Sequence, residues 1–299
     1  MPSYANLPPI IRCMRPHQWV KNVVVLAAFV FAMGDSTLNV GLPEFMLAVV
    51  GAGLFSLLSS SIYIINDLRD VELDRIHPTK RFRPIASGDV PPSSAKRLSV
   101  CLMLASLGLG FFLSREFGLV LLIYYFMQIA YTLKLKTIAL LDVTIIALGF
   151  VLRALSGAYL IGVPISPWLL VCTLLLAMML GLSKRRHEKV VLAGLEDSSR
   201  PSLSQTSGRV LDLLIWLVSL ATVVAYIAYT LSPTTIEKFG TDKLVYSAPF
   251  VVAGLARYLH LVYAQDKGER PERILLTDHP LIAILACYGL TVLGIFLSA

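Results

Sequence analysis

Charged residues are scarce in this 299-residue sequence, at 15%, whereas soluble globular domains carry about 25%. Hydrophobic residues make up 56% of the chain, and its mean hydropathy is +0.73. The four cysteines and five histidines are scattered without metal-ligand spacing, which argues against a zinc site. This composition argues against a water-soluble globule. It also leaves little soluble surface for the nucleic acid that a net charge of +7 would otherwise suggest.

What the sequence has instead is a series of apolar runs of roughly 15–22 residues, close to the ~20 residues that cross a bilayer. Membrane β-strands would alternate over about ten residues and are excluded by these unbroken windows. The sequence therefore predicts an all-α, polytopic membrane protein with a single domain over residues 1–299. We expect nine transmembrane helices, at 17–34, 44–66, 95–113, 116–134, 140–162, 166–183, 209–231, 244–263 and 280–298.

The distribution of lysine and arginine predicts the orientation of these helices. Most of the 26 basic residues fall on one side of the predicted helices. Arg115, Lys238 and Lys243 fall on the other side, and Arg153 lies within a span. By the positive-inside rule the basic side is cytoplasmic. We therefore predict a multi-pass protein of the inner (plasma) membrane, with a cytoplasmic N-terminus and an external C-terminus.

An acidic motif stands at the end of the second predicted span. Its polar members are Asn66, Asp67, Asp70 and Asp74. On a helix the three aspartates follow an i, i+3, i+7 pattern, so their carboxylates line one face and repel one another. A divalent cation would relieve this repulsion, and Mg²⁺ prefers such oxygen ligands. The alternative is a solvated helix end whose acids pair with Arg69 and Arg75.

The motif Asn66-Asp-x-x-Asp70-x-x-x-Asp74 resembles the first aspartate-rich motif of the UbiA superfamily of intramembrane prenyltransferases. This resemblance implies a nine-helix bundle over the whole chain, with cytoplasmic motif loops at 66–94 and 184–208. It also implies Mg²⁺-bound pyrophosphate, with catalytic roles for the three aspartates and metal binding by these and Asn66.

Two further segments resemble a narrower branch, the decaprenyl-phosphate phosphoribosyltransferases. They are Arg15-Pro-x-Gln18-Trp19-x-Lys21-Asn22 and His77-Pro-Thr-Lys80-Arg81-Phe-Arg83-Pro-Ile. The resemblance implies transfer of 5-phosphoribose from phosphoribosyl pyrophosphate to a polyprenyl phosphate such as decaprenyl phosphate, in the synthesis of a cell-wall arabinose-donor lipid. The sequence leaves the oligomeric state and the length of the lipid open.

Basic residues take the place where ordinary superfamily members carry a second aspartate-rich motif, at 181–189. Phosphate monoesters carry about −1.5 to −2 charge, which lysine and arginine bind well. The alternative is the basic flank of a membrane helix. The segment Tyr131-Thr-Leu-Lys134-Leu-Lys136 resembles the tyrosine–lysine element of the family. Its lysines fall at i+3 and i+5 and not at the Tyr-x-x-x-Lys spacing, so either Lys134 or Lys136 could contact phosphate. We predict substrate binding by Lys21, Asn22, Lys80, Arg81, Arg83, Tyr131, Lys134, Lys136, Arg153, Lys184, Arg185 and Arg186.

Two other functions are compatible with parts of this pattern. The first is an aromatic prenyltransferase of the same superfamily, which uses a prenyl diphosphate and a quinone precursor; the missing second acidic motif argues against it. The second is a non-catalytic carrier of lipid phosphates, for which the acidic motif has no clear purpose.

Overall fold

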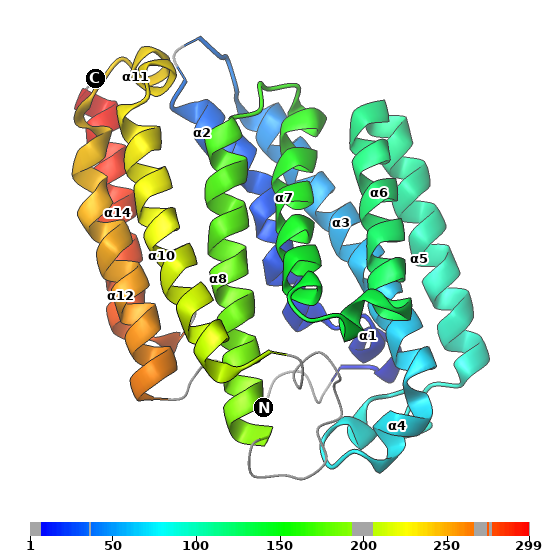
Figure 1. Cartoon of the computed structure of the whole chain (residues 1–299). Helices are drawn as coiled ribbons and strands as arrows, with labels where there is room; N and C mark the ends of the chain where they lie inside the picture. The colour runs from blue at the N-terminus through cyan, green and yellow to red at the C-terminus, as the bar shows by residue number, and fades with distance from the viewer. Residues whose placement is uncertain (1–6, 36, 193–205, 266–273, 275–276, 299) are drawn as a thin grey trace. The chain divides into compact units, whose positions relative to one another are not determined.

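The computed structural model describes residues 7–35, 37–192, 206–265, 274 and 277–298 (Figure 1). All regular structure within these ranges is helical, and eight helices are long and apolar enough to cross a membrane. These are α3 (Leu42–Arg69), α5 (Pro92–Leu113), α6 (Arg115–Leu133), α7 (Leu141–Ile161), α8 (Pro167–Leu192), α10 (Gly208–Leu231), η4 with α12 (Lys243–Ser247 and Ala248–Ala264) and α14 (His279–Ser298). The all-α membrane fold predicted from the sequence is therefore confirmed.

The first predicted span, 17–34, is helical but is wound differently from the others. It begins as a 3-10 helix, η1 (Pro16–Leu26), and continues as α2 (Ala27–Met33). Valines are frequent in η1, and β-branched side chains lower the preference for α-helix. Runs of 3-10 helix longer than three or four residues are uncommon, which marks η1 as a segment whose winding is imposed by its packing.

The chain divides into two compact units, each described here by itself. Unit 1 comprises Met1–Phe29, Leu42–Leu133 and Leu152–Pro164. Unit 2 comprises Val30–Gly41, Lys134–Val151 and Ile165–Ala299. The residues of helix α7 are shared between the two. The prediction of a single domain over the whole chain stays a prediction.

In unit 1, helices α3, α5 and α6 lie side by side (Figure 1). Their core is built on Phe55, Leu58 and Phe117, none of which is exposed. The ring of Tyr124 packs 4.6 Å, centroid to centroid, from that of Phe55. This core fixes the position of α3, whose far end carries the acidic motif.

A second, smaller core lies beneath the loop that follows α3. This loop contains α4 (Val71–Ile76) and η2 (Lys80–Phe82), and α1 (Pro9–Cys13) precedes it in the chain. Ile85 of the loop is 1% exposed and packs with Ile64 of α3 and Cys13. The predicted motif loop at 66–94 is therefore anchored to unit 1 by apolar contacts.

In unit 2, α8 packs along α10, and α12 packs against α14 (Figure 1). Leu182, Ile215 and Leu259 join α8, α10 and α12 in one buried cluster. A polar contact lies in another part of this unit, where the hydroxyl groups of Tyr226 and Ser247 lie 2.7 Å apart. The short helix α11 (Pro233–Phe239) follows α10.

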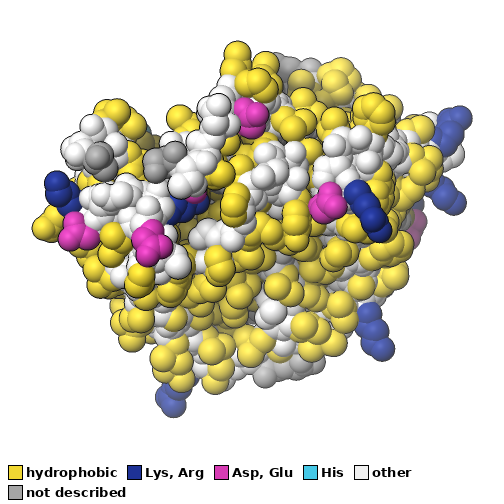
Figure 2. Space-filling model, turned by 90° about the horizontal axis from the view of Figure 1, so that it is seen from above, with side chains coloured by type: hydrophobic (Ala, Val, Ile, Leu, Met, Phe, Trp, Pro, Cys, Tyr) yellow, Lys and Arg dark blue, Asp and Glu magenta, His cyan; other side chains and the backbone are white. Residues whose placement is uncertain are grey.

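Many large apolar side chains face outward, as expected of helices in lipid. Phe112 of α5 and Leu297 of α14 are 84% and 81% exposed. Figure 2 views the end at the top of Figure 1, where apolar side chains cover most of the surface and charged ones are few. A soluble protein rarely exposes so much contiguous apolar surface, so the chain is an integral membrane protein.

One predicted helix boundary is wrong. The helix expected at 166–183 continues as α8 to Leu192, so the first part of the predicted loop 184–208 is helical. Lysine, arginine and glutamate are good helix formers, and Arg185 forms an i,i+3 ion pair with Glu188. Residues 193–205 of that loop lie outside the described residues.

Candidate functional site

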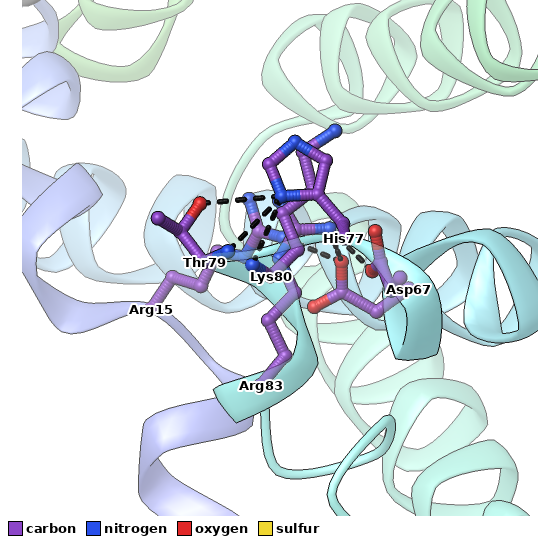
Figure 3. A network of polar contacts seen from close by, with 7 residues as sticks. Arg15, Asp67, His77, Thr79, Lys80 and Arg83 are labelled. Carbon is purple, nitrogen blue, oxygen red and sulfur yellow. Dashed lines mark hydrogen bonds and ion pairs between the residues drawn. The ribbon is translucent and has the colours of Figure 1, made fainter.

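Two buried carboxylates and two arginines form the centre of the candidate site in unit 1 (Figure 3). Asp67 stands in the last turn of α3 and Asp74 in α4, and their side chains are 4% and 3% exposed. Oδ1 of Asp67 accepts hydrogen bonds from Nη2 of Arg15 and from Nη1 of Arg83, the latter at 3.1 Å. The same Nη1 of Arg83 donates to Oδ2 of Asp74 at 2.6 Å. Arg83 therefore bridges the two carboxylates.

This arrangement corrects part of the sequence interpretation. The acidic motif does not lie on one continuous helix, because the backbone of Asp70 (φ −92°, ψ 10°) separates α3 from α4. Helical hydrogen bonds nevertheless continue across the break, from Asp70 N–H to Asn66 and from Asp74 N–H to Asp70. Asp67 and Asp74 are therefore brought together, whereas Asp70 is only half-buried. The repulsion that we expected is relieved by Arg83, from the loop after α4, and by Arg15, from the N-terminal segment.

Arg15 is a site residue to which sequence reasoning assigned no role. Its backbone has the left-handed conformation (φ 52°, ψ 61°), and it directly precedes Pro16. Such a conformation costs a non-glycine residue about 1–3 kcal/mol and persists only where its surroundings impose it. The guanidinium lies 5.1 Å from the centre of the Tyr63 ring. The motif that contains Arg15 is visible in the sequence, but its pairing with Asp67, 52 residues away, is not.

The loop between Asp74 and Arg83 is organised by His77. Its Nδ1 accepts hydrogen bonds from the backbone N–H groups of Thr79 and Lys80, at 3.2 and 3.3 Å (Figure 3). Burial and the positive charge of Lys80 lower the pKa of His77 below its ordinary value, which favours the neutral ring that this acceptor role requires. Arg81 is exposed, with its guanidinium 4.9 Å from the centre of the Phe82 ring.

The chemistry of the acidic motif suits a magnesium ion only in part. Within the described residues, no three histidine, cysteine, aspartate or glutamate side chains form a group that could hold a metal. Mg²⁺ usually needs only one or two carboxylates, because substrate phosphates and water complete its shell. Asn66 and Asp70, one helical turn apart and half-buried, offer oxygen ligands of this kind. The assignment of all four motif residues as metal ligands stays a prediction.

A second polar cluster in unit 1 surrounds Arg153 of α7, which is 5% exposed. Its Nε donates to Oδ1 of Asn22 and its Nη2 to the hydroxyl of Tyr124, both at 2.7 Å. Nδ2 of Asn22 in turn donates to Oγ of Ser56 at 2.9 Å. The structure thus brings together Asn22 and Arg153, two residues that the sequence predicted separately. Lys21 and Tyr131 of the same unit are half-buried.

Two of the basic residues predicted to bind phosphate in unit 2, Arg185 and Arg186, have acidic partners within that unit. Arg185, 5% exposed, forms an ion pair of 2.6 Å with the buried Asp142 of α7. Arg186 pairs with Asp212 of α10 at 2.6 Å, and its guanidinium lies 4.2 Å from the centre of the Tyr263 ring. Two of the three cations predicted to bind phosphate here thus contribute to helix packing. Lys184 and Lys136 are half-buried and Lys134 is exposed.

Comparison with known proteins gives this geometry a context. A decaprenyl-phosphate phosphoribosyltransferase of Mycolicibacterium smegmatis is 36% identical, over 97% of this chain and 93% of its own. One from Mycobacterium tuberculosis is 32% identical, over 95% of this chain and 92% of its own. A solved UbiA homologue from Archaeoglobus fulgidus, bound to GPP and Mg²⁺, superposes with a TM-score of 0.70 over 96% of this chain and 99% of its own. At 20% identity, that likeness shows the fold.

The family relationship extends over most of the chain. The model of the UbiA prenyltransferase family matches residues 22–277, a stretch that includes the acidic motif, its basic loop and the intramembrane arginine. The match agrees with the resemblance inferred from the motif and with the helical membrane fold. The chain is a member of the UbiA prenyltransferase family.

Proposed function

We propose that this protein transfers the 5-phosphoribosyl group of phosphoribosyl pyrophosphate to a polyprenyl phosphate, with release of pyrophosphate. The observation that carries the proposal is similarity over 97% of the chain to a relative named for this activity. The cluster at the end of α3 supports it, because arginines held beside buried carboxylates suit a substrate with several phosphate groups.

In this reaction the bond from the anomeric carbon to the pyrophosphate oxygen breaks. A new bond joins that carbon to an oxygen of the lipid phosphate. The lipid phosphate is already ionised at neutral pH, so no strong general base is required. The site agrees with this requirement: His77, which lies in the motif loop, uses Nδ1 to hold backbone N–H groups.

The residues of the chain have distinct tasks in this proposal. Arg83, with Lys80 and Arg81 in the same loop, binds phosphate groups of the substrates in unit 1. Lys134, Lys136 and Lys184 supply cations in unit 2 for a further phosphate. Arg153, Asn22, Arg185 and Arg186 hold helices in the positions that these sites need.

Magnesium is the cofactor that the family and its solved relatives indicate. Asn66 and Asp70 would hold it, with Asp67 and Asp74 nearby. When bound, the ion offsets the negative charge of pyrophosphate and so makes it a better leaving group.

The distribution of charge supports a proposal for the orientation in the membrane. We infer that the end of α3 with the acidic motif faces the cytoplasm of a cell whose plasma membrane holds the protein, because most lysines and arginines fall on that side. The water-soluble sugar donor then enters from the cytoplasm, and the polyprenyl chain of the acceptor lies in the bilayer.

The test is a transfer assay with purified protein in lipid nanodiscs, Mg²⁺, radiolabelled phosphoribosyl pyrophosphate and decaprenyl phosphate. We expect label in the organic phase, and no label when either Mg²⁺ or the lipid is omitted. Asp70→Asn should abolish transfer without changing protein abundance. Absence of transfer with polyprenyl phosphates of several lengths would reject the proposal.

The same preparation distinguishes the aromatic prenyltransferase. That activity would attach the prenyl group of GPP to 4-hydroxybenzoate, and we expect no such product. A lipid-phosphate carrier would yield no covalent product in either assay. Product from the aromatic acceptor alone would favour the other branch of the family.

A further inference from the structure

We propose that Asp67 and Asp74 are positioning residues, which hold Arg15 and Arg83 to bind a phosphate group of the substrate, and that neither carboxylate is a direct metal ligand. This inference rests on the proposed function for the identity of the substrate. It assigns Arg15 a role, and it limits the metal-binding part of the acidic motif to Asn66 and Asp70.

The first argument is that the arginine side chains of the cluster are more exposed to solvent than the carboxylates. The side chains of Asp67 and Asp74 are 4% and 3% exposed, whereas those of Arg15 and Arg83 are 20% and 27% exposed. The carboxylates therefore lie beneath the guanidinium groups. A ligand that approaches this cluster meets arginine nitrogens before it meets carboxylate oxygens, which favours an anion over a cation.

The second argument is the number of donors that the arginines retain. A guanidinium has five N–H groups. Arg15 uses Nη2 for Asp67, and Arg83 uses Nη1 for both Asp67 and Asp74. In the part of the chain that the structure describes, these are the only hydrogen bonds of either guanidinium. The remaining N–H groups can bind phosphate oxygens in pairs, the geometry that makes arginine a specific phosphate ligand.

The third argument is that Arg15 is fixed before any ligand arrives. Its left-handed backbone is braced on both sides, because Oγ of Ser60 donates to the carbonyl of Met14 at 2.8 Å and accepts from Nε1 of Trp19 at 3.0 Å. The ring of Tyr63 supports the guanidinium. A preorganised donor loses little freedom when the ligand binds.

The ligand is a phosphate or diphosphate group. It could belong to the sugar donor or to the lipid acceptor, and the experiment must separate the two. The variants are Arg15→Gln, Arg83→Gln, Asp67→Asn, Asp74→Asn and Asp70→Asn. Arg75→Gln is the matched control, since Arg75 pairs with Glu72 on the exposed face of α4 and lies outside the cluster.

Two binding measurements are made on each purified variant without turnover. Titration with pyrophosphate in the presence of Mg²⁺ measures the anion site. Titration with Mn²⁺ alone, followed by electron paramagnetic resonance, measures the metal site. Thermal unfolding in the same detergent confirms that each variant is folded, and Arg15→Gln combined with Asp67→Asn removes both charges of that pair.

We expect Arg15→Gln and Asp67→Asn each to weaken pyrophosphate binding about tenfold or more, as the loss of a charge-assisted hydrogen bond predicts. The double variant should be no worse than Asp67→Asn alone, because that change already removes the carboxylate that holds Arg15. Asp74→Asn should resemble Arg83→Gln, and Arg75→Gln should bind like the unaltered protein. Only Asp70→Asn should weaken Mn²⁺ binding.

The source of the phosphate follows from the Michaelis constants. A raised KM for phosphoribosyl pyrophosphate in Arg15→Gln identifies the donor, and a raised KM for polyprenyl phosphate identifies the lipid.

If Asp67→Asn or Asp74→Asn weakens Mn²⁺ binding as much as Asp70→Asn does, the inference is wrong. Unchanged pyrophosphate affinity in Arg15→Gln also overturns it. If the unaltered protein binds pyrophosphate as described but transfers no phosphoribose, the proposed function fails and the arginine site stands.

Discussion

The Nε atom of Arg153 donates a hydrogen bond to Oδ1 of Asn22 at 2.7 Å, so that an amide in η1 holds a buried cation of α7. Nη2 of Arg153 also donates to the hydroxyl of Tyr124, and the guanidinium lies 5.2 Å from the centre of the Phe55 ring. A charged group deep in a membrane protein is a default candidate for function. Here its contacts join η1, α3, α6 and α7 of unit 1, which is a structural role.

This role predicts that Asn22→Leu destabilises the protein. The change removes the acceptor of Arg153 and the donor to Ser56, and each buried group left unsatisfied costs about 1–3 kcal/mol. Ser56→Ala, which removes the hydrogen bond from Asn22 and the one that Ser56 donates to the carbonyl of Ala52, should cost about 1–2 kcal/mol. Thermal unfolding in detergent measures both effects. A stable Asn22→Leu protein that has lost affinity only for its lipid substrate would instead assign Arg153 to phosphate binding.

The buried pair of Asp142 and Arg185 predicts a different pattern. Asp142→Asn leaves the guanidinium buried without its carboxylate partner on α7, and breaking such a pair costs about 3–5 kcal/mol. Because Glu188 also pairs with Arg185, we expect a loss near the lower limit. The double variant Asp142→Leu with Arg185→Met removes both charges and should recover much of the stability. Thermal unfolding of the unaltered protein, of Asp142→Leu and Arg185→Met alone, and of the double variant forms a complete double-mutant cycle. A double variant less stable than either single one would contradict this account.

His77 is predicted to act through the backbone of its loop. His77→Ala removes the acceptor for the N–H groups of Thr79 and Lys80 and should raise the KM for the sugar donor several-fold, with a smaller effect on kcat. His77→Asn offers an oxygen acceptor near the same place and should restore most of the affinity. If both variants behave alike, the hydrogen bonds of Nδ1 are irrelevant to donor binding.

The same residue gives the expected dependence on pH. The pKa of His77 is lowered by burial and by the charges of Lys80 and Arg83, although Asp74 raises it. Protonation therefore costs more in the folded loop than in the unfolded chain. The contribution of the neutral ring is complete above its ordinary pKa of 6.5 and is lost as the pH falls below that value. Donor affinity should decline in this range in the unaltered protein, and less steeply in His77→Asn. The comparison of the two proteins cancels the titration of the substrate phosphates.

Hydropathy alone predicted most of the helices, because bilayer thickness sets their length and composition. The helices expected at 95–113 and 116–134 are observed as Pro92–Leu113 and Arg115–Leu133. The ends of helices were less predictable where a helix continues past its apolar segment into charged residues. Helix α8 does so, since its last turns are basic and it ends at Leu192. The 3-10 winding of η1 was not predictable, since its valines lower the preference for α-helix without specifying the 3-10 form.

The site was predictable in its residue types and not in its pairings. The acidic motif and the basic segment after it can be recognised within one stretch of sequence. That Arg15 from the N-terminal segment and Arg83 share Oδ1 of Asp67 depends on how three segments approach one another. The same holds for the ion pair of Asp142 with Arg185, which lie on different helices. A spacing rule describes one helix face, whereas an ion pair is a property of the fold.

The close contact between Gly157 and η1 gives the last prediction. A Cβ atom added to Gly157 of α7 would lie 1.9 Å from the carbonyl oxygen of Val25, which is a backbone atom with little freedom to move. Gly157→Ala must therefore push η1 away from α7 and disturb the hydrogen bond between Asn22 and Arg153, at a cost of about 1–3 kcal/mol or more. Gly53→Ala in α3 is the matched control, since no atom lies within 4 Å of its added Cβ. It should be neutral or slightly stabilising, because alanine is the better helix former. Thermal unfolding of the two variants provides the measurement, and equal stability would show that η1 can shift without loss.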